Sequence, residues 1–93
     1  MIVWDERKRE VNLKKHGLDF ADAHLVYKSP HKVTSTYVRN NEERKMDVAM
    51  VEIRRMVLAL VYVDRGADVR AISFRPASRR ERKRYEQGRA KQD

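Results

Sequence analysis

The sequence predicts one small domain of the α+β class, with its elements in the order β-α-α-β-β-β-β-α. A length of 93 residues fits a single domain spanning residues 1–93. Segments typical of helices, bounded by capping residues, lie near both ends of the chain. Between them, residues 32–75 contain four consecutive segments rich in alternating or β-branched apolar residues. Four such strands joined by short turns predict an antiparallel meander sheet with helices packed on it.

The N-terminal region is expected to contain a short strand and two helices. Residues 2–4 are apolar and β-prone, which indicates the strand. Asp5 is typical of a helix N-cap and Gly17 of a C-terminal stop, so the first helix is expected between them. A second helix is expected to begin at Asp19, another N-cap candidate, and to end before Pro30.

The four strands of the meander are separated by recognisable turns. A turn is expected at residues 39–43, a tight connection at Arg54–Arg55, and a hairpin loop around Gly66. The third strand is continuously apolar, as expected of a central strand covered on both faces. The predicted strands span residues 32–38, 44–53, 56–63 and 69–75.

The last helix should begin with a capping box formed by Ser78 and Glu81. It is expected to run to about Gln87 and to stop at Gly88, which leaves residues 89–93 as a frayed tail. The predicted core consists of apolar residues from all these elements: Trp4, Val11, Phe20, Val26, Val48, Met50, Leu58, Leu60, Val61 and Ile72.

Positive charge is concentrated near the C-terminus. The chain has 22 Lys and Arg against 14 Asp and Glu, which gives a net charge of +8. Eight basic and only two acidic residues lie between Arg75 and Lys91. Such a cluster indicates a surface for a polyanion, since neutralising phosphates releases counterions. The alternative is that the charge only keeps a small protein in solution.

Other composition features exclude several classes of protein. The chain has no cysteine, so neither disulfides nor thiolate metal sites are expected. The longest apolar run, residues 56–63, is too short to cross a bilayer, and the N-terminus lacks a signal-peptide pattern. We therefore expect a cytoplasmic protein without membrane association. The three histidines match no metal-ligand spacing, so neither a metal nor a cofactor is expected.

One face of the first helix carries candidate site residues. Lys8, Asn12 and His16 are spaced by four, and Lys15 lies near them. His16 is a candidate acid or base, and the helix dipole at this C-terminal position should favour its charged form. Spacing alone favours the simpler interpretation, in which this is a solvated polar face.

Two arginines near strand ends have two interpretations. Arg44 and Arg75 would most often form salt bridges at the rim of the sheet. The alternative is a phosphate site, in which Arg75, Ser78 and Arg79 hold one phosphate at the N-terminus of the last helix. Tyr85, the only large apolar residue of that helix, is expected to anchor it to the core, with a reacting phenol or a base-stacking platform as the alternatives.

These residues together resemble the BrnT family of type II toxins over nearly the whole chain. Two departures from the family pattern are the basic segment Lys28-Ser29-Pro30 and the tight, glycine-free connection at residues 53–56. The matching motifs are Trp4-Asp5-Glu6-Arg7-Lys8, Asn12, Lys15-His16-Gly17, Leu18-Asp19-Phe20, Glu43-Arg44, Ile72-Ser73-Phe74-Arg75-Pro76-Ala77 and Glu81-Arg82-Lys83-Arg84-Tyr85.

The resemblance implies a RelE-like fold, a metal-independent endoribonuclease that inhibits translation, and a BrnA-type antitoxin that also represses the operon. In such an enzyme the 2′-hydroxyl of RNA would attack the adjacent phosphate. Arg44 and Arg75 would stabilise the developing charge, and His16 would be the acid or base, with Glu43 and Tyr85 as alternatives. The expected RNA-binding residues are Lys8, Lys15, Arg79, Arg80 and Arg82. The competing hypothesis is a non-catalytic basic module that binds nucleic acid or docks on a partner.

Overall fold

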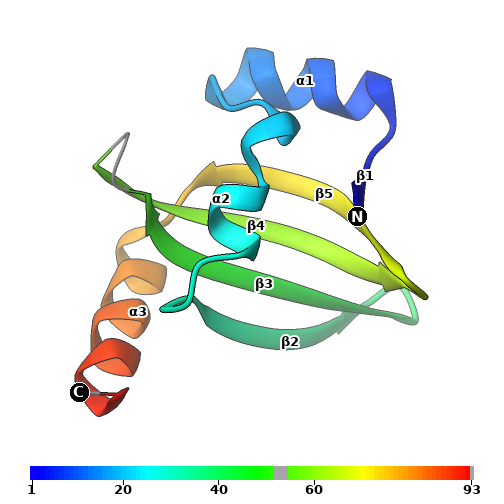
Figure 1. The fold of residues 1–93 in the computed structure, drawn as a ribbon. Coiled ribbons are helices and arrows are strands. Elements are labelled where there is room, and N and C mark those ends of the chain that lie inside the picture. Colours follow the sequence, from blue (N-terminus) through cyan, green and yellow to red (C-terminus); the bar gives the residue numbers. More distant parts are fainter. Residues whose placement is uncertain (52–54, 93) are drawn as a thin grey trace.

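A five-stranded sheet forms the centre of the computed structural model, which describes residues 1–51 and 55–92 (Figure 1). Helix α1 lies along the β5 side of the sheet, and α2 lies over one face of it. Helix α3 packs against β2 and β3. The elements in chain order are β1 (Ile2–Val3), α1 (Glu6–His16), the 3₁₀ helix η1 (Phe20–Asp22), α2 (His24–Tyr27), β2 (Val33–Arg39), β3 (Glu42–Val51), β4 (Met56–Arg65), β5 (Asp68–Pro76) and α3 (Arg79–Gln92).

The sheet confirms the α+β class but corrects its wholly antiparallel character. Its strand order is β1-β5-β4-β3-β2, in which β2 to β5 pair antiparallel with their neighbours in sequence. Strand β1 pairs with β5 in parallel, with Ile2 opposite Val69 and Val3 opposite Arg70. The sheet is therefore mixed, because the chain crosses from β1 over α1 and α2 before the meander begins.

Helix α1 has the two caps that the sequence predicts. The Asp5 carboxylate accepts hydrogen bonds from the backbone amides of Arg7 and Lys8, at 2.9 and 3.2 Å. Gly17 adopts a left-handed conformation with φ of 69°, and its amide donates to the Leu13 carbonyl at 2.8 Å. The helix therefore begins and ends at the residues expected from local chemistry.

The second predicted helix is divided into η1 and α2. The side chain of Asp19 caps η1 by accepting a hydrogen bond from the Ala21 amide at 2.9 Å. Phe20, Ala23 and Val26 are all buried and are spaced by three residues. This spacing matches the three residues per turn of a 3₁₀ helix better than an α-helix, so the initial 3₁₀ turn lets all three reach the core.

The hairpin between β2 and β3 turns through only two residues. Asn40 and Asn41 have φ values of 53° and 60°, as in a type I′ turn, and asparagine tolerates this left-handed conformation well. The predicted five-residue turn is therefore too long, and both strands extend into it. Of the tight connection expected at Arg54–Arg55, Arg54 lies outside the described residues, and Arg55 adopts a left-handed conformation with φ of 50° directly before β4.

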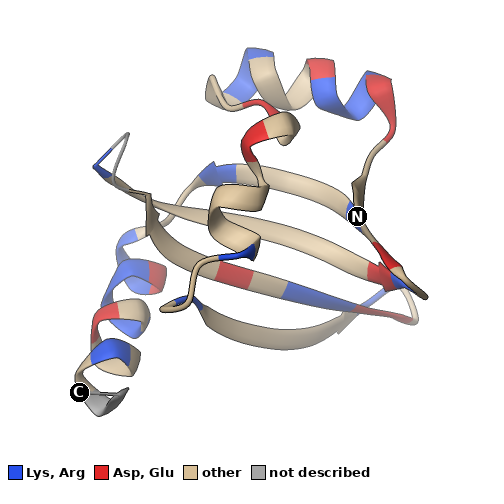
Figure 2. Cartoon of the chain, in the orientation of Figure 1, with Lys and Arg blue, Asp and Glu red and all other residues tan. Residues whose placement is uncertain are grey.

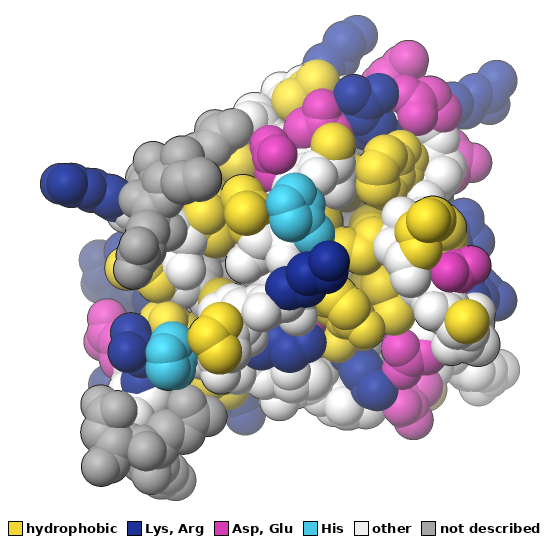
Figure 3. Space-filling view, in the orientation of Figure 1, with side chains coloured by type: hydrophobic (Ala, Val, Ile, Leu, Met, Phe, Trp, Pro, Cys, Tyr) yellow, Lys and Arg dark blue, Asp and Glu magenta, His cyan; other side chains and the backbone are white. Residues whose placement is uncertain are grey.

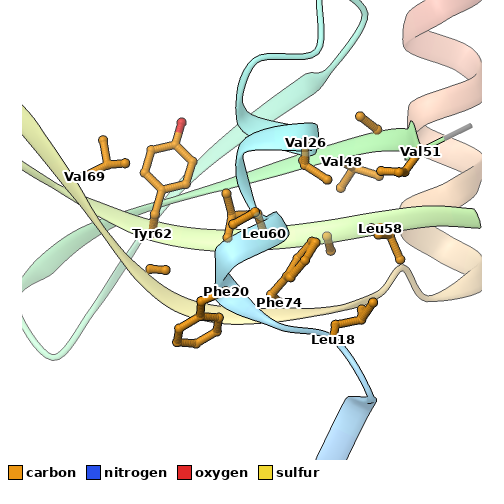
Figure 4. Close-up of a cluster of buried hydrophobic side chains, with 14 of the residues drawn as sticks. Leu18, Phe20, Val26, Val48, Val51, Leu58, Leu60, Tyr62, Val69 and Phe74 are labelled. Atoms are coloured by element: carbon orange, nitrogen blue, oxygen red, sulfur yellow. The ribbon is translucent and has the colours of Figure 1, made fainter. Parts of the chain in front are cut away.

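The core lies between the sheet and the segment from Leu18 to α2 (Figure 4). Phe20 and Phe74 are both essentially inaccessible to water. Three predicted core residues are wrong: Val11 is 63% exposed, Met50 is 42% exposed, and Ile72 is only half-buried and lies outside the core cluster. Helix α1 contacts the sheet through the polar side chain of Asn12, so the neighbouring Val11 is left exposed. On the face shown in Figure 3, hydrophobic side chains lie interspersed with charged ones.

Helix α3 continues past its predicted stop and runs to Gln92. Gly88 is an interior residue at which α3 approaches β2 closely, since a Cβ atom there would lie 2.8 Å from Cγ2 of Val33. The glycine therefore permits packing and does not end the helix, which corrects both the stop at Gly88 and the frayed tail as far as residue 92. None of the helices in the described part of the chain is long and apolar enough to cross a membrane.

Candidate active site

A pocket of about 460 Å³ opens between α1, the β2–β3 turn and the sheet. It brings together five of the candidate residues from the sequence, namely Lys8, Asn12, Lys15, His16 and Arg44. The residues that line it are Arg7, Lys8, Val11, Asn12, Lys15, His16, Arg39, Asn40, Arg44, Ile72 and Ser73.

The pocket is strongly basic. Five of its lining residues are Lys or Arg and a sixth is His16, and none of the described lining residues is acidic. The charges come from two separate parts of the chain, since α1 supplies three of the cations and the β2–β3 hairpin supplies Arg39 and Arg44. Cations gathered in a concave site reinforce one another's field, so the pocket is suited to an anion.

Asn12 fixes the position of α1 beside this pocket. Its side-chain amide donates hydrogen bonds to the carbonyls of Leu18 and Phe74, at 2.9 and 2.8 Å, and its oxygen accepts from the Phe74 amide at 3.0 Å. Asn12 thus pairs with the outer edge of β5 much as a neighbouring strand would. Lys8 and His16 lie one helical turn to either side, so this contact holds both at the pocket.

A second contact holds the start of α1 against the following segment. Arg9 forms a bidentate ion pair with Asp19, with N–O distances of 2.8 and 2.9 Å. The hydrogen bonds from Arg9 lower the pKa of Asp19 to about 2. Asn12 and Arg9 therefore attach α1 by two separate polar contacts, although most of this helix is exposed.

His16 is a half-buried imidazole among cations. Burial lowers its pKa below the usual 6.5, and the positive charges of Lys15 and Arg75 lower it further. The sequence predicted the opposite direction from the helix dipole, and that prediction is wrong, because burial and the neighbouring positive charges both disfavour the charged imidazole. His16 is therefore mainly neutral at neutral pH, the form that accepts a proton.

Arg44 has a nitrogen without a hydrogen-bond partner. Its side chain is only 18% exposed, and its Nε atom is buried with no hydrogen bond among the described residues. The closest acid is Glu42, whose Oε1 lies 3.7 Å from Nε, which is too long for a hydrogen bond. Glu42 also pairs with Arg65 at 3.2 Å. A buried donor left unpaired is costly, and because the Arg44 side chain lines the pocket, an acceptor bound there is the partner that this N–H lacks.

Arg75 is already engaged by a carboxylate. It donates two hydrogen bonds to Glu81, at 2.7 and 2.9 Å, and Glu81 also accepts from the Ser78 amide at 2.8 Å. The Ser78 hydroxyl accepts from the Glu81 amide, which completes the predicted capping box. Glu81 therefore occupies the position where the alternative interpretation put a phosphate. The rim salt bridge is the interpretation that this geometry supports.

The other candidates do not reach the pocket. Glu43 precedes Arg44 on β3, and because side chains alternate along a strand the two point to opposite faces of the sheet. Tyr85 is 4% exposed and belongs to the core, which agrees with its predicted role as an anchor. The remaining three are exposed on α3, which lies away from α1 (Figure 2): Arg79, Arg80 and Arg82.

Sequence reasoning missed two cations of the pocket. Arg7 immediately precedes Lys8 on α1 and lines the pocket. A spacing of four from Lys8 indicates the candidate residues on this helix, and Arg7 does not fit that spacing. Arg39 reaches the pocket because the Asn40–Asn41 turn folds β2 directly back onto β3. The paired asparagines are a signal that could have located this tight turn, and with it Arg39.

The described residues contain no group of three or more His, Cys, Asp or Glu side chains that could hold a metal ion. The chemistry that the site offers from its own residues is therefore proton transfer by an imidazole and stabilisation of negative charge by guanidinium and ammonium groups.

Comparison with known proteins places these residues in a family. Residues 4–81 match the family model described as a ribonuclease toxin, BrnT, of type II toxin–antitoxin systems. The matched range covers most of the 93 residues and includes all eleven residues that line the pocket. A search of curated proteins found no match.

Proposed function

Because the chain belongs to the BrnT family of ribonuclease toxins of type II toxin–antitoxin systems, we propose that its basic pocket is the site where RNA is bound and cut. Membership of the family implies RNA as the substrate and an antitoxin protein as the partner. The finer features, namely the reaction, its independence of metal and the residues that perform it, are argued from the site.

The proposed reaction is attack by the 2′-hydroxyl of RNA on the adjacent phosphate. Neutral His16 accepts the hydroxyl proton while the O2′–P bond forms and the P–O5′ bond breaks. The departing 5′-oxygen takes a proton from water, and the products are a 2′,3′-cyclic phosphate and a free 5′-hydroxyl. His16 needs only its own lone pair for this step, so the reaction proceeds without a metal ion.

Arg44 stabilises the charge that builds on the phosphate oxygens. Its Nε–H is buried and unpaired beside the pocket, so it can donate to a phosphate without first leaving another partner. Lys8 and Lys15 hold the flanking phosphates from α1, together with Arg7 and Arg39. The single observation that carries this proposal is Arg44's free buried donor in a pocket with a neutral histidine.

The residues outside the pocket have lesser roles in this proposal. Arg75 acts through its charge, which lowers the pKa of His16, while Glu81 holds its guanidinium. Glu43 and Tyr85 take no part in the reaction. The exposed cations Arg79, Arg80 and Arg82 give α3 a basic surface for a longer RNA substrate.

The biological setting proposed for the chain follows from the family. We place it in the cytoplasm, with a RelE-like arrangement of its sheet and helices. Its partner would be a BrnA-type antitoxin, with two-to-two as one stoichiometry to test, and operator DNA would be contacted only through that antitoxin.

The decisive experiment is cleavage of a mixed-sequence RNA by the purified chain in EDTA. We expect cyclic-phosphate ends from the unaltered chain and a loss of about 10²–10³-fold in rate for Arg44→Ala, the range seen when one charge-stabilising donor is removed. His16→Ala should be similarly impaired. Lys14→Ala removes an exposed cation of the same helix outside the pocket and serves as the matched control.

Each part of the proposal can fail separately. Full activity of folded Arg44→Ala and His16→Ala would disprove the assignment of the site. Cleavage that stops in EDTA and returns with a divalent cation would disprove metal independence. RNA binding without cleavage would favour the competing hypothesis of a non-catalytic basic module, for which the exposed arginines of α3 are the supporting observation.

A further inference from the structure

Tyr37 has an unusual position among the tyrosines of this chain. All four tyrosines lie in the described residues, and three are engaged by the protein. The rings of Tyr27 and Tyr62 pack edge to face with centroids 5.3 Å apart, and Tyr85 is buried. Tyr37 is 38% exposed, although it sits in the middle of β2.

The neighbours of Tyr37 are residues of the basic pocket. In the register of β2 and β3, Tyr37 is directly opposite Arg44, so both side chains lie on the same face at a Cβ separation of about 5 Å. Arg39 lies two residues further along β2 and therefore also faces that side. Arg39 and Arg44 both line the pocket. Tyr37 is therefore a neighbour of two cations that line the pocket, although it is not itself among the lining residues.

A row of uncharged side chains crosses the sheet beside Tyr37. Ser35 and Met46 form the next pair on this face, and Val61 and Ser73 continue the row across β4 and β5. Ser73 again lines the pocket. The row carries no charged or aromatic side chain, and Val61 in it is only 6% exposed. The electrostatic influence of Tyr37 on Arg75 is consistent with a phenol that leans over this row.

We propose that Tyr37 forms a nucleobase-binding subsite, on which a base of single-stranded RNA stacks next to the phosphate held by Arg44. The inference rests on the proposed function and adds a contact with the base to a site that otherwise contacts only phosphate. Exposed aromatic rings beside cations are the usual platform for unpaired bases, because every base has a flat face that can stack. Arg44 and Arg39 hold the backbone while the ring holds the base.

A simpler explanation is that Tyr37 is present because tyrosine favours β-strands. Val38 provides the matched comparison, since it is the next residue of β2, is 71% exposed and points to the opposite face. A residue chosen only for strand propensity should behave as Val38 does when it is replaced.

The test measures RNA binding by full-length chain that carries His16→Ala, so that no substrate is consumed. The probes are a labelled single-stranded RNA of mixed sequence and a backbone of the same length with abasic sites, followed by fluorescence anisotropy. We expect Tyr37→Ala to weaken binding of the ordinary RNA about ten-fold, within the range for loss of one stacked base, and to leave binding of the abasic strand unchanged. Tyr37→Phe keeps the ring and should retain most of the affinity.

Salt dependence separates this proposal from the proposed function. Arg44→Ala should reduce the slope of affinity against salt concentration, while Tyr37→Ala should lower affinity at every salt concentration without changing the slope. If the His16→Ala chain binds no RNA, both proposals are wrong. If it binds RNA with an Arg44-dependent slope but Tyr37→Ala behaves like Val38→Ala, only the base subsite is wrong. An equal loss on the abasic strand, or for Tyr37→Phe, would likewise overturn stacking.

Discussion

Replacing Glu81 by glutamine removes the carboxylate that joins the start of α3 to β5, with little change in side-chain shape. Glu81 accepts two hydrogen bonds from Arg75 and one from the Ser78 amide. The Arg75 guanidinium, as the largest influence, lowers the pKa of Glu81 from 4.5 to about 2. At about 1.4 kcal/mol per pH unit this difference corresponds to about 3 kcal/mol. Both side chains keep some exposure, so solvent screening reduces the expected loss of stability to about 1–2 kcal/mol.

The effect has a defined dependence on pH. A carboxyl whose pKa is lower in the folded chain stabilises it above the unfolded pKa, and this contribution is lost as the pH falls through the folded pKa. The unaltered chain should therefore unfold at a higher temperature than Glu81→Gln at pH 7. The two should converge between pH 4.5 and about pH 2. For a domain of this size 1 kcal/mol corresponds to about 4–8 °C, which thermal unfolding followed by circular dichroism resolves readily.

The matched control is Glu86→Gln, which removes an exposed carboxylate from the same helix. This variant leaves the pair between Arg75 and Glu81 intact. It should therefore change the midpoint of thermal unfolding little. Equal midpoints for Glu81→Gln and Glu86→Gln at pH 7 would refute the reasoning, as would a Glu81→Gln deficit that persists undiminished at pH 2.

Three further predictions test the site and its support. Asn12→Ala should lower the free energy of unfolding by about 2–4 kcal/mol in chemical denaturation, because it leaves buried backbone groups of Leu18 and Phe74 unpaired; a loss no larger than that of Lys14→Ala would contradict this. Gly88→Ala should destabilise the chain by about 1 kcal/mol despite the better helix propensity of alanine, because the new methyl group would clash with Val33. The additional substitution Val33→Ala should relieve this clash. An unaltered midpoint of thermal unfolding for Gly88→Ala would contradict the close packing. The cleavage rate should fall at acid pH with a midpoint below 6.5, since the pKa of His16 is lowered. A decline centred above 6.5 in a pH–rate profile would contradict this.

The parts of the fold that could be predicted from sequence are those set by local chemistry. The caps of α1 at Asp5 and Gly17, and the capping box of Ser78 and Glu81, depend on residues within one helical turn of each other. The same local reasoning fails at Gly88, where a glycine that would end an isolated helix is instead required by contact with a strand distant in sequence. The parallel pairing of β1 likewise depends on where β5 lies.

For the candidate site, too, the sequence indicated some residues correctly but not the properties that depend on distant parts of the chain. His16 could be selected by residue type, but the direction of its pKa depends on burial and on Arg75, which is far away in sequence. Strand-end position selected both Arg44 and Arg75, yet it could not distinguish them. Glu81 pairs with Arg75 because the capping box aims this carboxylate back at the strand end, whereas Glu42 stands too far from Arg44 Nε to pair with it well. The distinction therefore depends on distances that only the folded chain defines.

The distribution of ion pairs supports the proposal that RNA binds at the pocket. The acidic residues near the sheet are largely occupied by cations outside the pocket, as with Asp47 and Lys32 at 2.8 Å and Asp64 and Lys45 at 2.7 Å. Of the five Lys and Arg side chains in the pocket, Arg44 lies near Glu42. Within residues 1–51 and 55–92, no ion pair engages the other four, namely Arg7, Lys8, Lys15 and Arg39. Their field is thus uncompensated by the protein and is directed into one concavity. A phosphate chain supplies the missing negative charge, and its binding should weaken steeply with salt because counterions are released at each contact.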